Sequence, residues 1–127
     1  MQNKNCYCCS GKTFQSCCEP YLLGIQNAFS PETLMRSRYS AFATHHGDYL
    51  LETTHYSTRK NHTKAAILEW ATTNEWIKLE VLHANDATVE FKAHYRDQSN
   101  QTHIHHEFST FKKENDNWYF VDGTFVD

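Results

Sequence analysis

All five cysteines of this 127-residue chain lie between residues 6 and 18. Four of them form two pairs, Cys6-x-Cys8 and Cys17-Cys18, which are eight residues apart. Four thiolates on so short a segment suit a tetrahedral metal ion, because soft sulfur ligands satisfy its charge and geometry. Gly11 provides a turn between the pairs, and about one helical turn over residues 12–17 brings the second pair back to the first. We therefore predict that Cys6, Cys8, Cys17 and Cys18 bind one zinc ion per chain.

Iron is the alternative metal, since four thiolates accept both ions. Disulfides and reactive thiols are the alternatives to a metal site. Disulfides require an oxidising compartment, and the N-terminal residues show no apolar signal region, so we expect the protein in the cytoplasm with reduced cysteines. The odd number of cysteines fits four ligands and one spare, which we expect to be Cys9.

Residues 6–18 resemble the SEC-C motif, a small metal-binding knuckle found at the end of the translocation motor SecA and in other bacterial proteins. The usual pattern is C-P-C-G-S-G-K, a short run with an aromatic residue, and then C-C or C-H. Ser10-Gly11-Lys12, Phe14 and all four ligand positions match it. Tyr7 stands where proline is usual and Cys9 where glycine is usual, and the second departure concerns the geometry of the turn.

Composition excludes several classes of protein. No segment approaches the roughly 20 apolar residues of a membrane helix, so we expect no membrane partner. The net charge is −3. Residues 1–23 carry a net charge of +1 and the rest −4, so the knuckle is too weakly basic to predict a nucleic-acid finger. Aromatic residues make up 14% of the chain, which is enough for the core of one compact domain beside the knuckle.

The remaining chain predicts three helices followed by four strands. Ser30-Pro31 begins the first helix, with Gly47 as its left-handed cap; Asp48 opens a second helix, and Asn61 caps a third. After Asn74 the apolar period becomes alternating. The predicted strands start near residues 77, 89, 102 and 118 and are separated by polar turns.

This order predicts an α+β fold: a metal knuckle over residues 1–23 and a cone-like domain over residues 24–127, in which three helices pack on a curved four-stranded antiparallel sheet. The order resembles the nuclear-transport-factor-2-like fold, where the cone is a pocket in enzymes and an interface in binding proteins. With the knuckle, residues 34–42 and the segments His106-Glu107-x-Ser109-x-Phe111 and Trp118-Tyr119-x-Val121-Asp122-Gly123 resemble the YchJ-like bacterial family. That resemblance implies a fold and a metal motif rather than an activity.

Arg38 is the first candidate for a pocket residue, because it shares a helix face with Leu34, Tyr39 and Phe42. A buried guanidinium needs a carboxylate or several carbonyl groups, and Glu107 is the first candidate partner and Asp122 the second. Two interpretations remain: an ion pair that holds the helix on the sheet, or a polar cluster that binds an anionic or polar ligand.

Histidines give a second group of candidates. Alternation places His103, His105 and Glu107 on one face of a strand and His106 on the other. His103 and His105 could contribute to a metal site, and His106 with Glu107 could act as an acid–base pair. The simpler interpretation is that these histidines belong to a polar surface.

The leading functional hypothesis is a non-enzymatic docking or adaptor protein with no catalytic residue. Its knuckle would bind a protein partner, and its cone a small ligand or partner. The resemblance to SEC-C proteins implies a partner in translation, chaperoning or export. The alternative is a small enzyme that acts on a polar or anionic ligand in the cone. Its pocket would include Tyr39, Asp122 and Arg38 as the anion clamp, with Glu107 or His106 as the acid or base.

Overall fold

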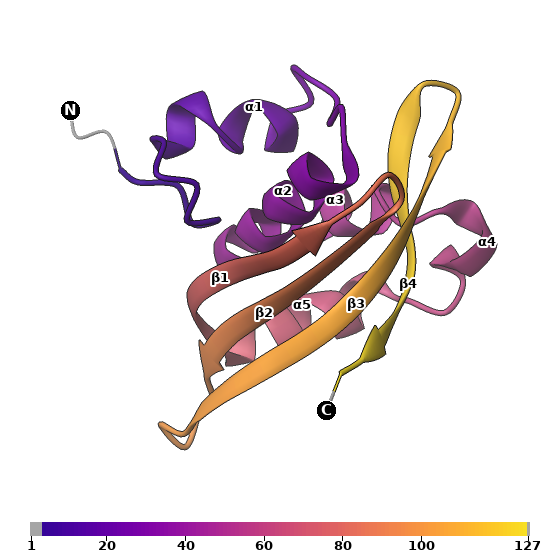
Figure 1. Ribbon diagram of the computed structural model, residues 1–127. Coiled ribbons are helices and arrows are strands. Elements are labelled where there is room, and N and C mark those ends of the chain that lie inside the picture. Colours follow the sequence, from indigo (N-terminus) through magenta and orange to yellow (C-terminus); the bar gives the residue numbers. More distant parts are fainter. Residues whose placement is uncertain (1–3, 127) are drawn as a thin grey trace.

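The computed structural model describes residues 4–126, so residues 1–3 of the predicted knuckle and residue 127 lie outside it. A metal-knuckle segment and a layer of helices cover one face of a single four-stranded sheet (Figure 1). The helical elements are the 3₁₀ turn η1 (Phe14–Ser16) and the α-helices α1 (Glu19–Leu22), α2 (Pro31–Thr44), α3 (Gly47–Glu52), α4 (Tyr56–Arg59) and α5 (Lys64–Thr73). The strands are β1 (Glu75–Ala84), β2 (Thr88–Arg96), β3 (Thr102–Glu114) and β4 (Asn117–Phe125). The predicted α+β class and four-stranded antiparallel sheet are confirmed.

The N-terminal segment folds as a minimal hairpin followed by two short helices. A single antiparallel bridge joins Asn5 to Thr13, and the Cys6 amide donates to the Lys12 carbonyl at 2.8 Å. Gly11 adopts a φ of 89°, as the predicted turn requires. Helix α1 follows Cys18 directly, with Pro20 in its first turn. The chain thus returns the second pair of cysteines to the first.

Helix α2 is the central helix of the fold. The Ser30 side chain accepts a hydrogen bond from the Thr33 amide, and Pro31 fills the first helical position, as predicted. The predicted end was wrong: His45, not Gly47, adopts the left-handed cap with a φ of 66°, and Gly47 begins α3. The cap two residues earlier leaves Gly47 in close contact with Leu68 of α5, where a Cβ would lie 3.0 Å from that side chain.

The other helices differ from the prediction in number and in one cap. The three longer helices α2, α3 and α5 correspond to those expected, while α1 and α4 are additional four-residue helices. Helix α5 is capped by Thr63, whose side chain accepts from the Ala66 amide, so the predicted Asn61 cap was wrong. Within residues 4–126, no helix is long and apolar enough to cross a membrane.

The sheet has the order β1-β2-β3-β4 and is antiparallel throughout. Register shifts at Ile77 and Leu82 interrupt the pairing of β1 with β2, and another lies in β4 at Val121. Such bulges bend a strand and reverse which side chains face the core. Trp76 therefore packs inward and Ile77 is exposed, whereas strict alternation from Leu79 and Val81 would place Ile77 on the inner face.

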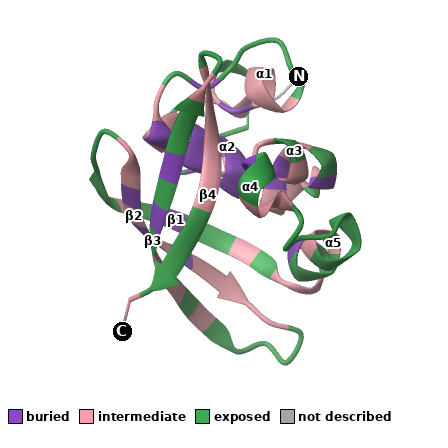
Figure 2. Ribbon diagram, turned by 90° about the vertical axis from the view of Figure 1, so that its right-hand side faces the viewer, coloured by how far each residue is buried: buried purple, intermediate pink, exposed green. Residues whose placement is uncertain are grey.

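The core lies between α2 and the concave face of the sheet, and Figure 2 shows the buried residues gathered along α2 and the facing strands. Cys6, Cys8 and Cys18 belong to the same cluster of buried residues as Leu34 and Tyr39. The knuckle and the remaining chain therefore share one core. The expectation that the body has a core separate from the knuckle was wrong, because α2 packs against the cysteine segment as well as the sheet.

Candidate metal centre and cavity

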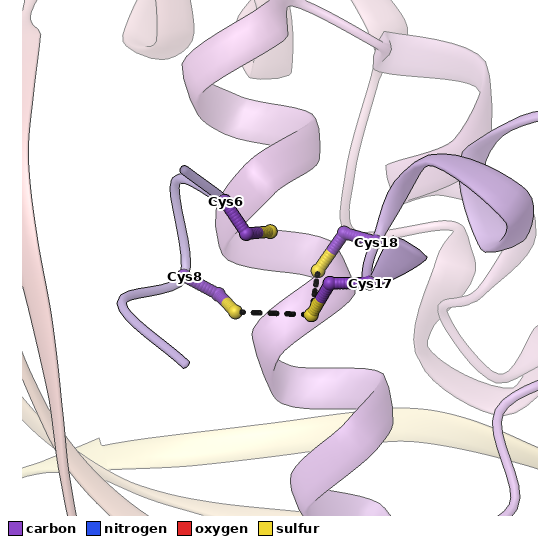
Figure 3. A group of neighbouring side chains, drawn as sticks. All are labelled: Cys6, Cys8, Cys17 and Cys18. Carbon is purple, nitrogen blue, oxygen red and sulfur yellow. Dashed lines mark hydrogen bonds between the residues drawn. The ribbon is translucent and has the colours of Figure 1, made fainter. Parts of the chain in front are cut away.

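The four predicted ligands point toward one another (Figure 3). Their Sγ atoms all lie within 4.8 Å of one another, and Cys8 and Cys17 are separated by 3.7 Å and Cys17 and Cys18 by 3.9 Å. Three members of the group are buried, since Cys8 is 0%, Cys18 1% and Cys6 4% exposed, while Cys17 is half-buried. All five cysteines are free thiols. The fold thus places four cysteines so that they could bind one metal ion.

The spacing of the sulfur atoms fits such an ion. A metal–sulfur bond of about 2.3 Å in a tetrahedron places neighbouring sulfurs about 3.8 Å apart, close to the distances seen here. The residues present therefore fit a tetrahedral four-thiolate centre, and the ion would hold the hairpin, η1 and the start of α1 together. The same geometry suits zinc and iron, so the identity of the metal stays a prediction.

The four thiols perturb one another because they are crowded and partly buried. Hydrogen bonds from Cys18 and Cys8 lower the pKa of Cys6, while the hydrogen bond with Cys6 raises the pKa of Cys18. A thiolate at Cys6 would thus be stabilised by its neighbours, while ionisation of a second thiol would add negative charge to the same group. A bound cation removes that repulsion, so metal binding and release of the remaining protons are coupled.

Helix α2 supplies the contacts around the four cysteines. Arg36 donates from Nη1 to the Cys8 carbonyl at 2.7 Å, and its Nε is held by Glu32 at 3.0 Å, one turn earlier. The Ser40 hydroxyl lies 3.6 Å from the Cys6 sulfur, and the Ser10 hydroxyl 3.2 Å from that of Cys17. Sequence analysis missed Arg36 and Ser40. Their four-residue spacing, which places them on one helix face, was the only available signal.

Cys9, the predicted spare, does not belong to the group of four neighbouring thiols. It is exposed, and its sulfur accepts a hydrogen bond from the Leu79 amide of β1 at 3.5 Å. Its φ is 64°, in the left-handed region that favours glycine. This conformation gives a physical reason for the glycine that is usual at this position of the motif.

We expect the variant Cys9→Gly to bind metal as the wild type does and to be more stable by about 0.5–1 kcal/mol, because glycine adopts a positive φ without steric strain. Urea unfolding of the metal-loaded proteins measures the difference. Cys9→Ser is the matched control, since it keeps a side chain in the same conformation and should show no gain. A destabilised Cys9→Gly protein would contradict the strain argument.

A second feature is a cavity of about 210 Å³ between the helices and the concave face of the sheet. Arg38, Tyr39 and Glu107 line it, as predicted pocket residues, together with aromatic side chains from α2, α5, β1, β2 and β4. The Tyr39 ring lines the cavity, but its hydroxyl is buried without a hydrogen-bond partner within residues 4–126, and burial raises its pKa. The cavity is therefore mostly apolar, with a few charged groups.

Arg38 has different partners from those predicted. Its Nη1 donates to the Leu50 carbonyl at 2.9 Å and to the Thr53 hydroxyl at 2.7 Å, and its guanidinium lies 4.6 Å from the centre of the Phe120 ring. No described carboxylate oxygen lies within 4.0 Å of a guanidinium nitrogen of Arg38, which is the limit for an ion pair. The predicted pairing with Glu107 or Asp122 was therefore wrong. The reason is that α3 and the residue after it, Leu50 and Thr53, supply the acceptors, while β4 contributes only the Phe120 ring.

Glu107 pairs with His105, two residues earlier on the same face of β3. The His105 Nε2 lies 2.6 Å from one carboxylate oxygen, and the Ser109 hydroxyl donates to the other at 2.5 Å. Burial alone would raise the pKa of Glu107, but these hydrogen bonds outweigh it and hold the pKa below its ordinary value. The sequence placed His105 on the same face as Glu107, but His105 was not predicted as a pocket residue, and Ser109 was missed. Strict alternation along the strand from Glu107 puts both His105 and Ser109 on the face that lines the cavity.

Two predicted pocket residues lie elsewhere. His106 does not line the cavity and instead pairs with Glu90 of β2 at 2.7 Å, so the suggested His106–Glu107 acid–base pair was wrong. Adjacent residues of a strand face opposite sides, which separates them. Asp122 is exposed on β4 and does not line the cavity. His103 pairs with Asp97 at 2.7 Å, and within residues 4–126 the only group of metal-ligating residues is the cysteine cluster.

The lowered pKa of Glu107 predicts a loss of stability in acid. Its carboxylate is more acidic in the folded than in the unfolded chain, so its contribution is present above the unfolded pKa of about 4.3 and is lost as the pH falls through the lower folded value. Urea unfolding between pH 7 and pH 3 measures this. Glu107→Gln should have a smaller decrease over that interval, whereas an unchanged decrease would show that Glu107 does not contribute.

The comparisons agree with this architecture. A family model described as "YchJ, middle NTF2-like domain" matches residues 30–123, which is most of the chain. The chain belongs to the YchJ-like family. YchJ-like relatives include a UPF0225 protein of Geobacter sulfurreducens, 39% identical over 93% of this chain and 77% of its own length. Another, from Pectobacterium carotovorum subsp. carotovorum, is 34% identical over 98% of this chain and 85% of its own length.

Two solved structures share the complete YchJ-like arrangement, knuckle included. The solution structure of a SEC-C motif containing protein from Rhodopseudomonas palustris is 40% identical, with a TM-score of 0.89 over 98% of this chain and 100% of that one. The crystal structure of a SEC-C motif containing protein from Psychrobacter arcticus is 28% identical, with a TM-score of 0.77 over 100% of this chain and 84% of that one. The SEC-C motif and the nuclear-transport-factor-2-like domain therefore occur together in this family.

Proposed function

We propose that this YchJ-like protein is a metal-binding docking protein, in which one zinc ion in the four-cysteine site fixes a surface that binds a protein partner. The spacing of the four sulfur atoms supports the metal. In this proposal the metal has a structural role and takes no part in a chemical reaction. It holds the hairpin and α1 in one conformation, as structural four-thiolate sites do.

One observation carries the docking role. Three large apolar side chains, Leu23, Ile25 and Phe29, are 61%, 72% and 77% exposed on the segment that leaves the knuckle. Exposed apolar side chains gathered on one segment are typical of protein-binding surfaces. Gly24, with a φ of 77°, and the hydrogen bonds of Ile25 and Gln26 to the Pro20 carbonyl fix the start of this segment on α1. The surface is therefore attached to the elements that the metal orders.

The metal is tested by elemental analysis of protein purified without added metal or chelator. We expect about one zinc per chain; iron at the same ratio would keep the ligands but replace the metal, and absence of both would reject the site.

The docking role is tested by comparing wild type with the triple variant Leu23→Ser/Ile25→Ser/Phe29→Ser, which leaves every cysteine in place. A partner identified by cross-linking and mass spectrometry is then purified and titrated. The triple variant should keep its zinc and lose most of the affinity for that partner, while Ile104→Ser, an equally polar change at a 57% exposed residue of β3, should not. Equal binding by the triple variant would reject this surface.

A further inference from the structure

We propose that the cavity is a binding site for a small organic acid: a carboxylate held by Arg38, attached to an apolar or aromatic body that fills the space between α2, α5 and the sheet. This inference does not depend on the metal site or on the docking surface. It starts from hydrogen-bonding groups of Arg38 that the described protein leaves unpaired.

The guanidinium of Arg38 is fixed by the protein on one side only. All of its hydrogen bonds, to Leu50, Thr53 and Thr54, come from Nη1. The Phe120 ring packs against it at 4.6 Å and fixes its plane. Within residues 4–126, Nε and Nη2 have no protein acceptor. These two nitrogens are not fully buried either, since among the described residues the Tyr39 hydroxyl is the only fully buried side-chain polar atom without a partner.

The free edge of the guanidinium defines the chemistry of the ligand. Nε and Nη2 present two parallel N–H groups, and this fork matches the two oxygens of a carboxylate. Arg38 remains charged, because burial lowers its pKa only to about 10. A buried charge without an ion-pair partner is costly, and a bound carboxylate would neutralise it. A bound anion would therefore use the hydrogen-bonding groups of Arg38 that the protein leaves free.

The rest of the cavity selects the body of the ligand. Phe42, Trp70, Trp76, Phe91 and Phe120 provide apolar and aromatic walls. The volume of about 210 Å³ is below that of a drug-sized site, so it fits a fragment-sized molecule. At the β3 side, His105, Glu107 and Ser109 face the same space, and the two oxygens of Glu107 are occupied by His105 and Ser109. The charges of Glu107 and Arg38 attract each other without forming an ion pair, so a ligand carboxylate would bind at the guanidinium and not beside Glu107.

The probes are 3-phenylpropionate and its uncharged analogue 3-phenylpropanamide, which have the same body and differ in the group that meets Arg38. Each is titrated into the metal-loaded protein, followed by the fluorescence of Trp70 and Trp76 and by ¹H–¹⁵N NMR including the Arg38 Nε–H signal. We expect saturable binding of the acid, a shift of the Arg38 signal, and at least about tenfold weaker binding of the amide. No saturable binding of the acid, or equal affinity for both probes, would overturn the proposal.

Two variants locate the site. Arg38→Lys keeps a positive charge but loses the fork, and it should weaken binding of the acid about tenfold or more. Ala93→Leu should abolish binding of both probes, because Ala93 lines the cavity from β2 and the larger side chain occupies it. Ile104→Ala is the control on the outer face of β3. If Arg38→Lys does not fold, the comparison of acid with amide and the Ala93→Leu variant still decide the question, and an unchanged affinity in Ala93→Leu would place the probe elsewhere and reject the site.

Discussion

Replacing Cys8 by Ser should remove the metal and lower the free energy of unfolding by at least about 3 kcal/mol, the largest effect that we expect from any single change. Cys8 is 0% exposed and packs in the same core as Leu34 and Tyr39. Its carbonyl also accepts the hydrogen bond from Arg36. Loss of the metal should therefore loosen α2 as well as the knuckle. Elemental analysis gives the metal content, and urea unfolding with hydrogen exchange gives the stability and the region affected.

Cys9→Ser is the matched control for this variant, because it makes the same chemical change one residue later at an exposed side chain. It should retain the wild-type metal content and nearly all of the stability. Metal retained at full occupancy in Cys8→Ser would reject the four-thiolate assignment. Complete loss of metal in Cys9→Ser would show that Cys9 is one of the ligands.

Gly123→Ala should lower the free energy of unfolding by about 1–3 kcal/mol through a clash with Glu107. A Cβ at Gly123 would lie 2.6 Å from Cδ and 2.9 Å from Cγ of Glu107, and closer still to one carboxylate oxygen. The carboxylate cannot move aside freely, because His105 and Ser109 hold its two oxygens. The alanine therefore displaces a buried charged group from its hydrogen bonds. Urea unfolding at neutral pH measures the loss.

A double-mutant cycle separates this clash from a general effect of alanine on β4. In a Glu107→Ala background the Cβ has room, so Gly123→Ala should cost much less than in the wild type, with a coupling of about 1 kcal/mol or more. Thr124→Ala, at the next and exposed residue of β4, should be close to neutral. Additive effects of Gly123→Ala and Glu107→Ala would contradict a contact between the two positions.

The features that depend on local sequence were predicted well. The spacing of the cysteines, the glycine turn and the Ser30-Pro31 helix start are all encoded within a few residues, and the structure has the turn and the helix start as expected. The order of three main helices and four antiparallel strands follows from the change of apolar period near Asn74. In β3 the alternation of side chains also placed His105 and Glu107 on one face, and both line the cavity.

The features that depend on contacts between distant segments were not predictable in this way. The partners of Arg38 come from α3 and the residues directly after it, and no pattern in the sequence shows that these residues, rather than β3, supply its acceptors. At the bulge at Ile77 the alternation of inward and outward side chains along β1 shifts by one residue, and periodicity alone cannot locate this shift. The core that the knuckle shares with α2 and the sheet could not be predicted from local sequence either, because Arg36 and Ser40 contact the cysteines only after α2 packs on the knuckle.

The hydrogen bond from the Leu79 amide to Cys9 has a consequence for solubility. Strand β1 pairs with β2 on one side only, so its other side is a row of backbone groups that another strand could pair with, and the knuckle covers part of it. The opposite border of the sheet is covered in a similar way, since Phe120 exchanges backbone hydrogen bonds with Thr53 and His55. Loss of the metal would loosen the knuckle together with α2 and so uncover this edge of β1. Self-association through the exposed strand edge should therefore accompany the loss of stability in metal-depleted protein.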